Sequence, residues 1–205
     1  MKSPITVDLP AVLVDTWDTF SSELSKTPLP HFTESVFRFL FVRSLLQRYP
    51  DVRCETEWKR LDLVFFDDSG PVVVEFKFYV YNYHRDFQGA SKYQKGGACE
   101  KNFEEFCRCV RSLVQLDTKA WGKDQGANIR NRYVIIAYAD ADGLEGINAY
   151  RTWYHQLKLP ENVTQIANIR TFTRLSDLAC RVTKHRMTCQ MFQVLPIASE
   201  NSLRW

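Results

Sequence analysis

The chain has 205 residues, of which 45% are hydrophobic and 25% are charged, a balance typical of a soluble globular protein with a sizeable core. Its net charge of +3 is too mild to indicate a nucleic-acid partner, and it does not exclude one. We expect no membrane partner, because no apolar run is long enough to cross a bilayer. The start of the chain lacks the apolar segment of a signal peptide, and the six cysteines show no zinc-binding spacing. A cytoplasmic protein with reduced, mostly buried thiols is therefore expected.

Two helices are predicted in the first quarter of the chain. A short helix is expected at Val12–Phe20, and the proline-containing stretch Thr27–Pro30 ends it. A second helix is predicted from Thr33, a favourable N-cap, to Tyr49, where Pro50 closes it. Because the residues of this second helix are apolar nearly all round, we expect it to be buried or packed on two sides.

Three segments rich in valine, phenylalanine and other strand formers follow the second helix. The predicted strands are Val52–Trp58, Arg60–Phe66 and Pro71–Val80. The polar and aromatic segment Tyr81–Ala98 is expected to be a long loop, and loops of that length are often functional. Apolar residues at helical spacing then predict an amphipathic helix over Phe103–Val114.

The remaining elements are predicted to alternate between strand and helix. The continuous apolar run Tyr133–Ala139 indicates a buried central strand. Weaker patterns place a helix at Leu144–Leu157, a strand at Gln165–Phe172, a helix at Leu175–Thr183 and a last strand at Cys189–Leu195. We therefore expect an α/β fold with a mixed central β-sheet flanked by helices.

The most informative segment is the hairpin Arg60–Tyr79, whose turn is predicted at Asp67–Gly70. With the turn centred there, antiparallel partners have residue numbers that sum to 137, so Asp62 lies opposite Glu75. Side chains alternate between the two faces of a strand, and Glu75 and Lys77 therefore share a face with Asp62. The other face of the hairpin is expected to be apolar and to hold Leu61, Leu63, Phe65, Val72, Val74, Phe76 and Phe78.

The predicted polar face holds two carboxylates and one amine among hydrophobic neighbours, which is costly unless the charges are paired or bind a metal. A divalent cation between Asp62 and Glu75 would relieve their repulsion, and carboxylate oxygens suit Mg²⁺ or Mn²⁺. Lys77 beside such a site could stabilise charge on a phosphorane, or help to position and deprotonate a water. The alternative is a structural salt bridge between Lys77 and one of the two acids at the edge of a sheet.

This pattern resembles that of the PD-(D/E)xK nuclease superfamily, also called restriction-endonuclease-like. The family places an acid at a strand start and an (E/D)xK triplet on the next strand of a hairpin, which here are Asp62 and Glu75-Phe76-Lys77. The family's proline before the first acid is replaced by Leu61. The resemblance implies a single restriction-endonuclease-like domain over residues 1–205. Its α-β-β-β-α-β core would span about residues 32–140, with a C-terminal extension at about 141–205.

The resemblance also implies a Mg²⁺- or Mn²⁺-dependent endonuclease that hydrolyses phosphodiester bonds in double-stranded DNA, in restriction, defence or repair. Asp62, Glu75 and the main-chain carbonyl of Phe76 would bind the metal, and Lys77 would orient or activate the attacking water. Members often carry a further acid on the first helix, and Glu34 matches that position. The alternative for Glu34 is a favourable acid near a helix N-terminus.

Basic residues after the hairpin are candidates for contacts with the DNA backbone. The segment Tyr93–Gly97 is similar to a Lys-Gly-bearing entry to the second core helix in some branches of the family, and Lys92 and Lys95 could reach phosphates there. A solvated position is the alternative for both lysines. Two other functions stay open: a non-catalytic nucleic-acid- or protein-binding subunit that retains the nuclease fold, and an RNA- or structure-specific nuclease. A homodimer or a protein partner is compatible with cutting both strands.

Overall fold

The computed structural model of the chain describes residues 5–27, 31–58, 60–79, 82–85, 92–95, 100–116, 129, 131–141, 159–176 and 182–196. The described helices are α1 (Leu9–Leu24), α2 (Glu34–Arg48) and α3 (Glu100–Val114). The described strands are β1 (Arg53–Trp58), β2 (Leu61–Asp67), β3 (Gly70–Tyr79), β4 (Asn82–Arg85), β5 (Lys92–Lys95), β6 (Asn131–Ala141), β7 (Val163–Ser176) and β8 (Val182–Val194).

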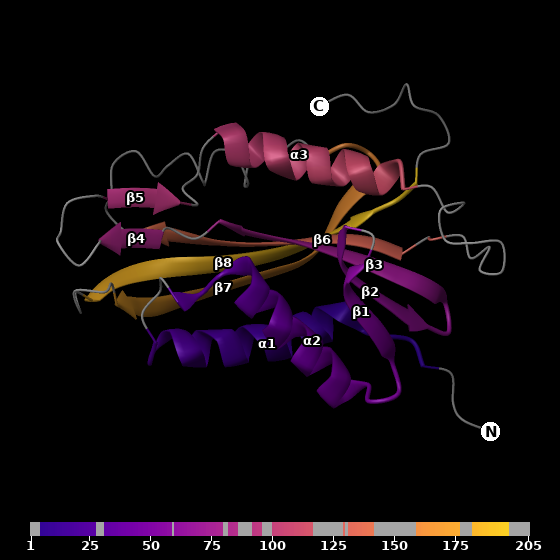
Figure 1. Ribbon diagram of the computed structural model, residues 1–205, viewed down its shortest axis with the longest axis horizontal. Coiled ribbons are helices and arrows are strands. Elements are labelled where there is room, and N and C mark those ends of the chain that lie inside the picture. The colour runs from indigo at the N-terminus through magenta and orange to yellow at the C-terminus, as the bar shows by residue number, and fades with distance from the viewer. Residues whose placement is uncertain are drawn as a thin grey trace.

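These elements form an α/β fold in which helices flank a mixed sheet, and this coarse prediction is confirmed. The six-stranded sheet has the order β1-β2-β3-β6-β8-β7, while β4 and β5 form a separate two-stranded sheet. Strands β3 and β6 pair in parallel, so the chain must cross over between them, and α3 lies in that crossover. Figure 1 shows α1 and α2 on one face of the large sheet and α3 on the opposite face.

The core under α1 and α2 is built from aromatic rings. The ring of Phe37 in α2 lies 5.3 Å from that of Phe20 in α1 and 6.2 Å from that of Phe76 in β3. Edge-to-face pairs of this kind add about 0.5–1.5 kcal/mol to the gain from burial. The indole Nε1 of Trp17 donates a hydrogen bond of 3.1 Å to Thr171 Oγ1, which ties α1 to β7 at the edge of the sheet.

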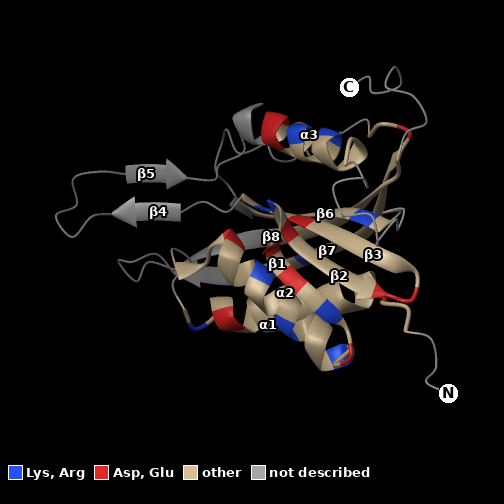
Figure 2. Cartoon of the chain, turned by 45° about the vertical axis from the view of Figure 1, so that its right-hand side comes forward, with Lys and Arg blue, Asp and Glu red and all other residues tan. Residues whose placement is uncertain are grey.

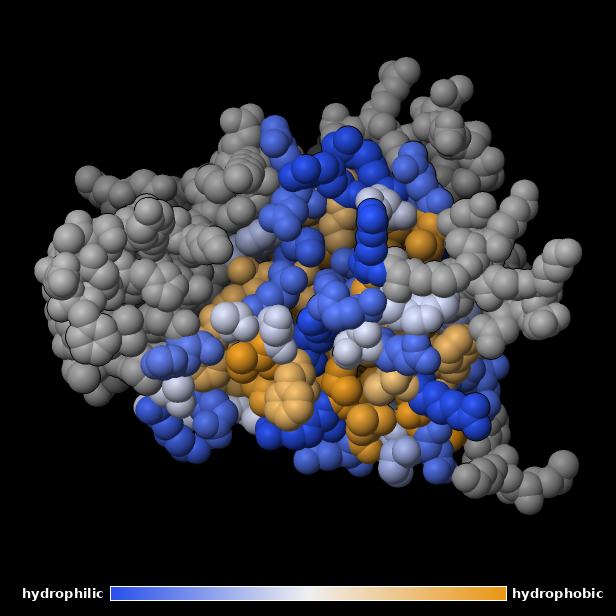
Figure 3. Space-filling view, viewed as in Figure 1, coloured by the Kyte–Doolittle hydropathy of each residue, from blue (hydrophilic) through white to orange (hydrophobic). Residues whose placement is uncertain are grey.

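Helix α2 begins at its predicted cap but is not packed on two sides. The hydroxyl of Thr33 accepts a hydrogen bond of 3.3 Å from the backbone N–H of Val36, as an N-cap should. Phe39 on the outer side is 62% exposed, and Leu46 is also exposed, so the expectation of a helix packed on two sides was wrong. Figure 3 shows hydrophobic side chains among hydrophilic ones on the surface of this region. The inner side alone is buried, through Phe37, Leu40, Phe41 and Leu45.

The predicted register of the central hairpin is confirmed. Val64 pairs with Val73 and Leu63 with Val74, so partner numbers sum to 137. Two side chains depart from the predicted faces: Leu61 joins the cluster under α3 rather than the aromatic core, and the Asp62 carboxylate contacts Arg38 of α2. Both departures lie at the start of β2, next to Arg60, which has a left-handed φ of 70°.

Helix α3 is held to the sheet at its C-terminal end by a buried arginine. Arg132 of β6 donates hydrogen bonds to the carbonyls of Leu113 at 2.6 Å and Val114 at 2.9 Å. It also donates to the carbonyls of Leu116 and Ile129. The last carbonyls of a helix have no partner within the helix, and their partial negative charge favours a cation. Arg132 therefore fixes the position of α3 over β3 and β6.

Several predictions for the second half of the chain need correction. The expected loop Tyr81–Ala98 contains the strands β4 and β5, which pair as an antiparallel hairpin. The expected helix at Leu175–Thr183 is wrong, because its described ends belong to β7 and β8 and pair with each other. The expected helix at Leu144–Leu157 lies outside the described residues. The C-terminal extension is an integral part of the fold, since β8 lies between β6 and β7 in the large sheet.

Two further predictions concern membrane-spanning helices and the state of the cysteines. Among the described residues, no helix has the length and apolar character needed to cross a bilayer. The four cysteines that the structure describes are free thiols. Cys54 is half-buried, and the buried ones are Cys107, Cys109 and Cys189.

Candidate active site

The candidate site lies along the edge of β3, where its pairing with β2 ends. The paired residues run from Asp67 and Gly70 to Leu63 and Val74, and β3 continues beyond this point. There the backbone N–H of Phe76 donates a hydrogen bond of 2.8 Å to Asp62 Oδ2 instead of to a strand carbonyl. The backbone N–H of Phe78 is in turn hydrogen-bonded to the Glu34 carboxylate. Carboxylates from β2 and α2 thus occupy the same free edge.

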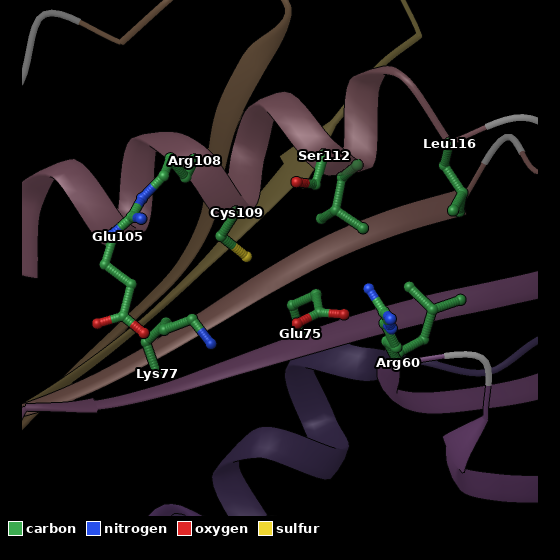
Figure 4. A pocket seen from close by; sticks show the side chains of 10 residues that line it. Arg60, Glu75, Lys77, Glu105, Arg108, Cys109, Ser112 and Leu116 are labelled. Atoms are coloured by element: carbon green, nitrogen blue, oxygen red, sulfur yellow. The ribbon is translucent and has the colours of Figure 1, made fainter.

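A cavity of about 540 Å³ opens between this part of β3 and helix α3. Figure 4 shows Glu75 and Lys77 extending from β3 toward α3, with Cys109 and Ser112 of α3 on the facing wall. Arg60 lies on the other side of Glu75 from Lys77 in this view. The cavity is lined by Arg60, Leu61, Glu75, Lys77, Glu105, Arg108, Cys109, Ser112, Leu113 and Leu116.

Asp62 touches Glu75 but faces away from the cavity. The Asp62 backbone N–H donates a hydrogen bond of 3.4 Å to Glu75 Oε1. The Asp62 carboxylate accepts a hydrogen bond of 2.8 Å from Arg38 Nη1 at Oδ1, while its other oxygen is bound to the N–H of Phe76. Asp62 is therefore a neighbour of Glu75, as the register predicted, but its side chain reaches toward α2 rather than sharing the face of Glu75 and Lys77.

The crowding of acids raises the pKa of Glu75. Burial, the negative charge of Asp62 and a hydrogen bond with its side chain together raise this pKa to about 8, although the charge of Lys77 acts in the opposite direction. At neutral pH the Glu75 carboxyl is consequently protonated in much of the metal-free protein. A carboxyl held in this way would release its proton to solvent when a cation binds.

Glu34 and Lys77 are electrostatically linked at the same edge. Burial raises the pKa of Glu34, partly opposed by the charge of Lys77 and by the hydrogen bond from Phe78. Burial lowers the pKa of Lys77, but the carboxylates of Glu34, Asp62 and Glu75 raise it more, so the net shift is upward. Lys77 is therefore an ammonium ion at neutral pH, and its Nζ donates a hydrogen bond of 2.8 Å to the carbonyl of Phe76.

The donor set is of the kind that Mg²⁺ and Mn²⁺ prefer. Glu34, Asp62 and Glu75 offer hard carboxylate oxygens from three elements, and the Phe76 carbonyl is a further oxygen next to Glu75 in the chain. These side chains do not form a ready-made cluster, since the described residues contain no group of three acids, histidines or cysteines at metal-binding distance. Arg38 and Lys77 engage Asp62 and Phe76 instead, so a cation would have to displace these contacts.

The structure describes Lys92 and Lys95 only as backbone of strand β5, so their predicted phosphate contacts remain predictions. Sequence reasoning missed Arg38, although it lies four residues after Glu34 and hence on the same side of α2. It also missed Glu105 and Cys109 of α3, which line the cavity and belong to no motif in the sequence.

Helices α2 and α3 each carry charges of both signs. Figure 2 shows basic and acidic residues side by side on α2 and on α3. Comparison of the chain with protein-family models, with curated proteins and with solved structures found no match. The functional interpretation therefore depends on the geometry of the described residues.

Proposed function

We propose that this chain is a metal-dependent phosphodiesterase that hydrolyses DNA by means of a restriction-endonuclease-like core. The observation that carries the proposal is the convergence of Glu34, Asp62, Glu75 and Lys77 at the free edge of β3, from three separate elements. The element order α2-β1-β2-β3-α3-β6, with a hairpin inserted before α3, supports the same proposal.

In this proposal Asp62 and Glu75 would hold Mg²⁺ or Mn²⁺, with Glu34 at the outer part of the site. The bound ion would polarise a phosphoryl oxygen and lower the pKa of a bound water. The Phe76 carbonyl could join the ligands only after Lys77 releases it. Because the pKa of Lys77 is raised, its ammonium would stabilise negative charge on the phosphorane and orient the water, rather than act as the base.

Two arginines beside the candidate site are suited to binding a polyanionic substrate. Arg60 at the start of β2 and Arg108 of α3 line the same cavity as Glu75 and are exposed. Guanidinium groups bind phosphates bidentately, so these two could hold phosphates on either side of the reacting one. Positioning of this kind contributes to catalysis by lowering the entropy cost of reaching the transition state.

A non-catalytic binding subunit is the second candidate, and the ion pair of Arg38 with Asp62 favours it. If Asp62 and Glu34 serve only to satisfy the N–H groups of Phe76 and Phe78, the acids stabilise the fold and need no metal. Titration with Mn²⁺ separates the two candidates, since the binding subunit would take up no divalent ion at this site.

The proposal predicts that the purified chain cleaves DNA with Mg²⁺ or Mn²⁺ and not with EDTA. Asp62→Asn and Lys77→Met should each lower the cleavage rate about 100-fold or more, because one removes a metal ligand and the other a transition-state cation. Duplex, single-stranded, flap and RNA substrates measured in parallel would identify the preferred nucleic acid.

Glu55→Gln and Lys26→Met are the matched controls for the cleavage assay. Both change one exposed charge outside the cavity, on β1 and in the turn that follows α1. They should cleave at the rate of the unmodified chain. Equal cleavage by the Asp62 and Lys77 variants would mean that the activity resides elsewhere, and the site assignment would fall.

A further inference from the structure

An arginine occupies the position at Asp62 that a metal ion would need. Arg38 Nη1 lies 2.8 Å from Asp62 Oδ1, and Arg38 Nη2 pairs with Glu57 Oε1 at the end of β1. The Arg38 and Asp62 side chains are only 12% and 14% exposed, whereas Glu57 is 65% exposed. The strongest part of this three-residue bridge is therefore the half-buried contact between Arg38 and Asp62.

The surroundings of Asp62 explain why a cation resides there. Its negative charge lies beside the carboxyl groups of Glu34 and Glu75, and all three side chains are partly removed from water. The amine of Lys77 donates to the carbonyl of Phe76, and Asp62 is paired with Arg38. Arg38 reaches Asp62 from α2, where it lies on the same side of the helix as Glu34.

From this geometry we propose that Arg38 is a resident counter-cation that competes with the divalent ion for Asp62. The inference rests on the proposed function, because it concerns the same site. In the metal-free protein the guanidinium of Arg38 neutralises the charge of Asp62 and so reduces the repulsion between Asp62 and the neighbouring acids. A metal ion binds through Asp62 only when the guanidinium moves off Oδ1, so Arg38 lowers the affinity of the site for metal.

Two consequences distinguish this role from that of a merely structural ion pair. Loss of Arg38 should destabilise the protein in EDTA, because Asp62 is left half-buried and unpaired. The same loss should strengthen metal binding, because the ion no longer has to displace a competing charge. A structural pair gives the first effect without the second.

The test compares Mn²⁺ binding by isothermal titration calorimetry among the unmodified chain, Arg38→Gln and Arg48→Gln. Arg38→Gln should bind Mn²⁺ about tenfold more tightly than the unmodified chain, the size expected from removing one neighbouring positive charge. Arg48→Gln is the matched control on the same helix, since Arg48 pairs with Asp15 in a largely exposed contact of 3.0 Å. It should bind Mn²⁺ with unchanged affinity.

Thermal denaturation provides a second readout. The denaturation temperature of Arg38→Gln should be lower than that of the unmodified chain in EDTA and should rise more on addition of Mn²⁺. If Arg38→Gln does not fold, Arg38→Lys can be measured instead. Lysine keeps the positive charge, but its ammonium does not reach as far as a guanidinium. Arg38→Lys should therefore show a smaller gain in Mn²⁺ affinity than Arg38→Gln.

The outcomes separate the inference from the proposed function. Mn²⁺ binding by the unmodified chain with equal or weaker binding by the Arg38 variants would overturn the inference alone. An absence of Mn²⁺ binding in all forms would overturn the proposed function and the inference together. Binding seen in Arg38→Gln and too weak to measure in the unmodified chain would support both.

Discussion

At the scale of single residues, the site is defined by carboxylates that serve as hydrogen-bond acceptors for a strand edge. Asp62 and Glu34 receive the N–H groups of Phe76 and Phe78, which a neighbouring strand would otherwise satisfy. This arrangement holds the oxygens of both acids next to Glu75 and Lys77 without a flexible loop. Groups on rigid elements keep their geometry better than groups on loops, which suits a catalytic or metal-binding role.

The pH dependence of stability tests the environment of Glu75. An unfolded glutamate has a pKa near 4.5 and folded Glu75 one of about 8, so the folded chain retains a proton that the unfolded chain has lost within this window. Stability must therefore fall as pH rises from 4.5 to about 8 and change little from this cause above it. Glu75→Gln should remove this contribution, so the variant gains stability relative to the unmodified chain as pH rises.

Urea denaturation in EDTA across that pH window measures the effect. Glu55→Gln, with an exposed side chain on β1, should follow the profile of the unmodified chain. Parallel profiles for Glu75→Gln and the unmodified chain would show that Glu75 is ionised normally and that the acids do not crowd each other.

At the scale of elements, the sequence predicted those whose local pattern and packing agree. Helix α2, strands β1 to β3, helix α3 and strand β6 all lie within a few residues of their predicted bounds. The register of β2 and β3 could also be predicted, because any slip by one residue would place Glu75 among phenylalanines. The sequence therefore predicts that Asp62 and Glu75 are neighbours, and a hydrogen bond joins them in the structure.

What could not be predicted depends on contacts between distant segments. Residues 175–183 have apolar side chains at helical spacing, but their described ends pair as β7 and β8, and tertiary pairing overrides local preference. The pair of Arg38 with Asp62 depends on the angle of α2 over the sheet, which no spacing in the sequence defines. The faces on which Leu61 and Asp62 lie at the start of β2 likewise leave no clear signal in residue types.

Helix α3 forms one wall of the cavity, and Arg132 fixes its C-terminal end. Arg132→Met should lower the free energy of unfolding by about 2–4 kcal/mol, because several buried carbonyls lose a charged donor. Chemical denaturation measures this loss. Arg43→Met, which changes an exposed arginine of α2, should stay within about 0.5 kcal/mol of the unmodified chain. An equally small effect of Arg132→Met would mean that hydrophobic packing alone holds α3 in place.

At the scale of the whole molecule, the candidate site lies in one half of the large sheet, and the other half contributes to the core. Strands β1 to β3 carry the site between α2 and α3, whereas β8 and β7 extend the sheet on the far side of β6. Met187, Cys189 and Met191 of β8 are buried in the same core as Phe37 and Phe76. The C-terminal strands therefore stabilise the layer on which α1 and α2 rest.

The whole account depends on three elements delivering oxygen ligands to one point, and the position of a bound ion tests this most directly. Crystals grown or soaked with Mn²⁺ should give an anomalous scattering peak in contact with the carboxylates of Asp62 and Glu75, with Arg38 moved away from Asp62. The account would be contradicted by crystals saturated with Mn²⁺ that show no peak between these residues while Arg38 remains bound to Asp62.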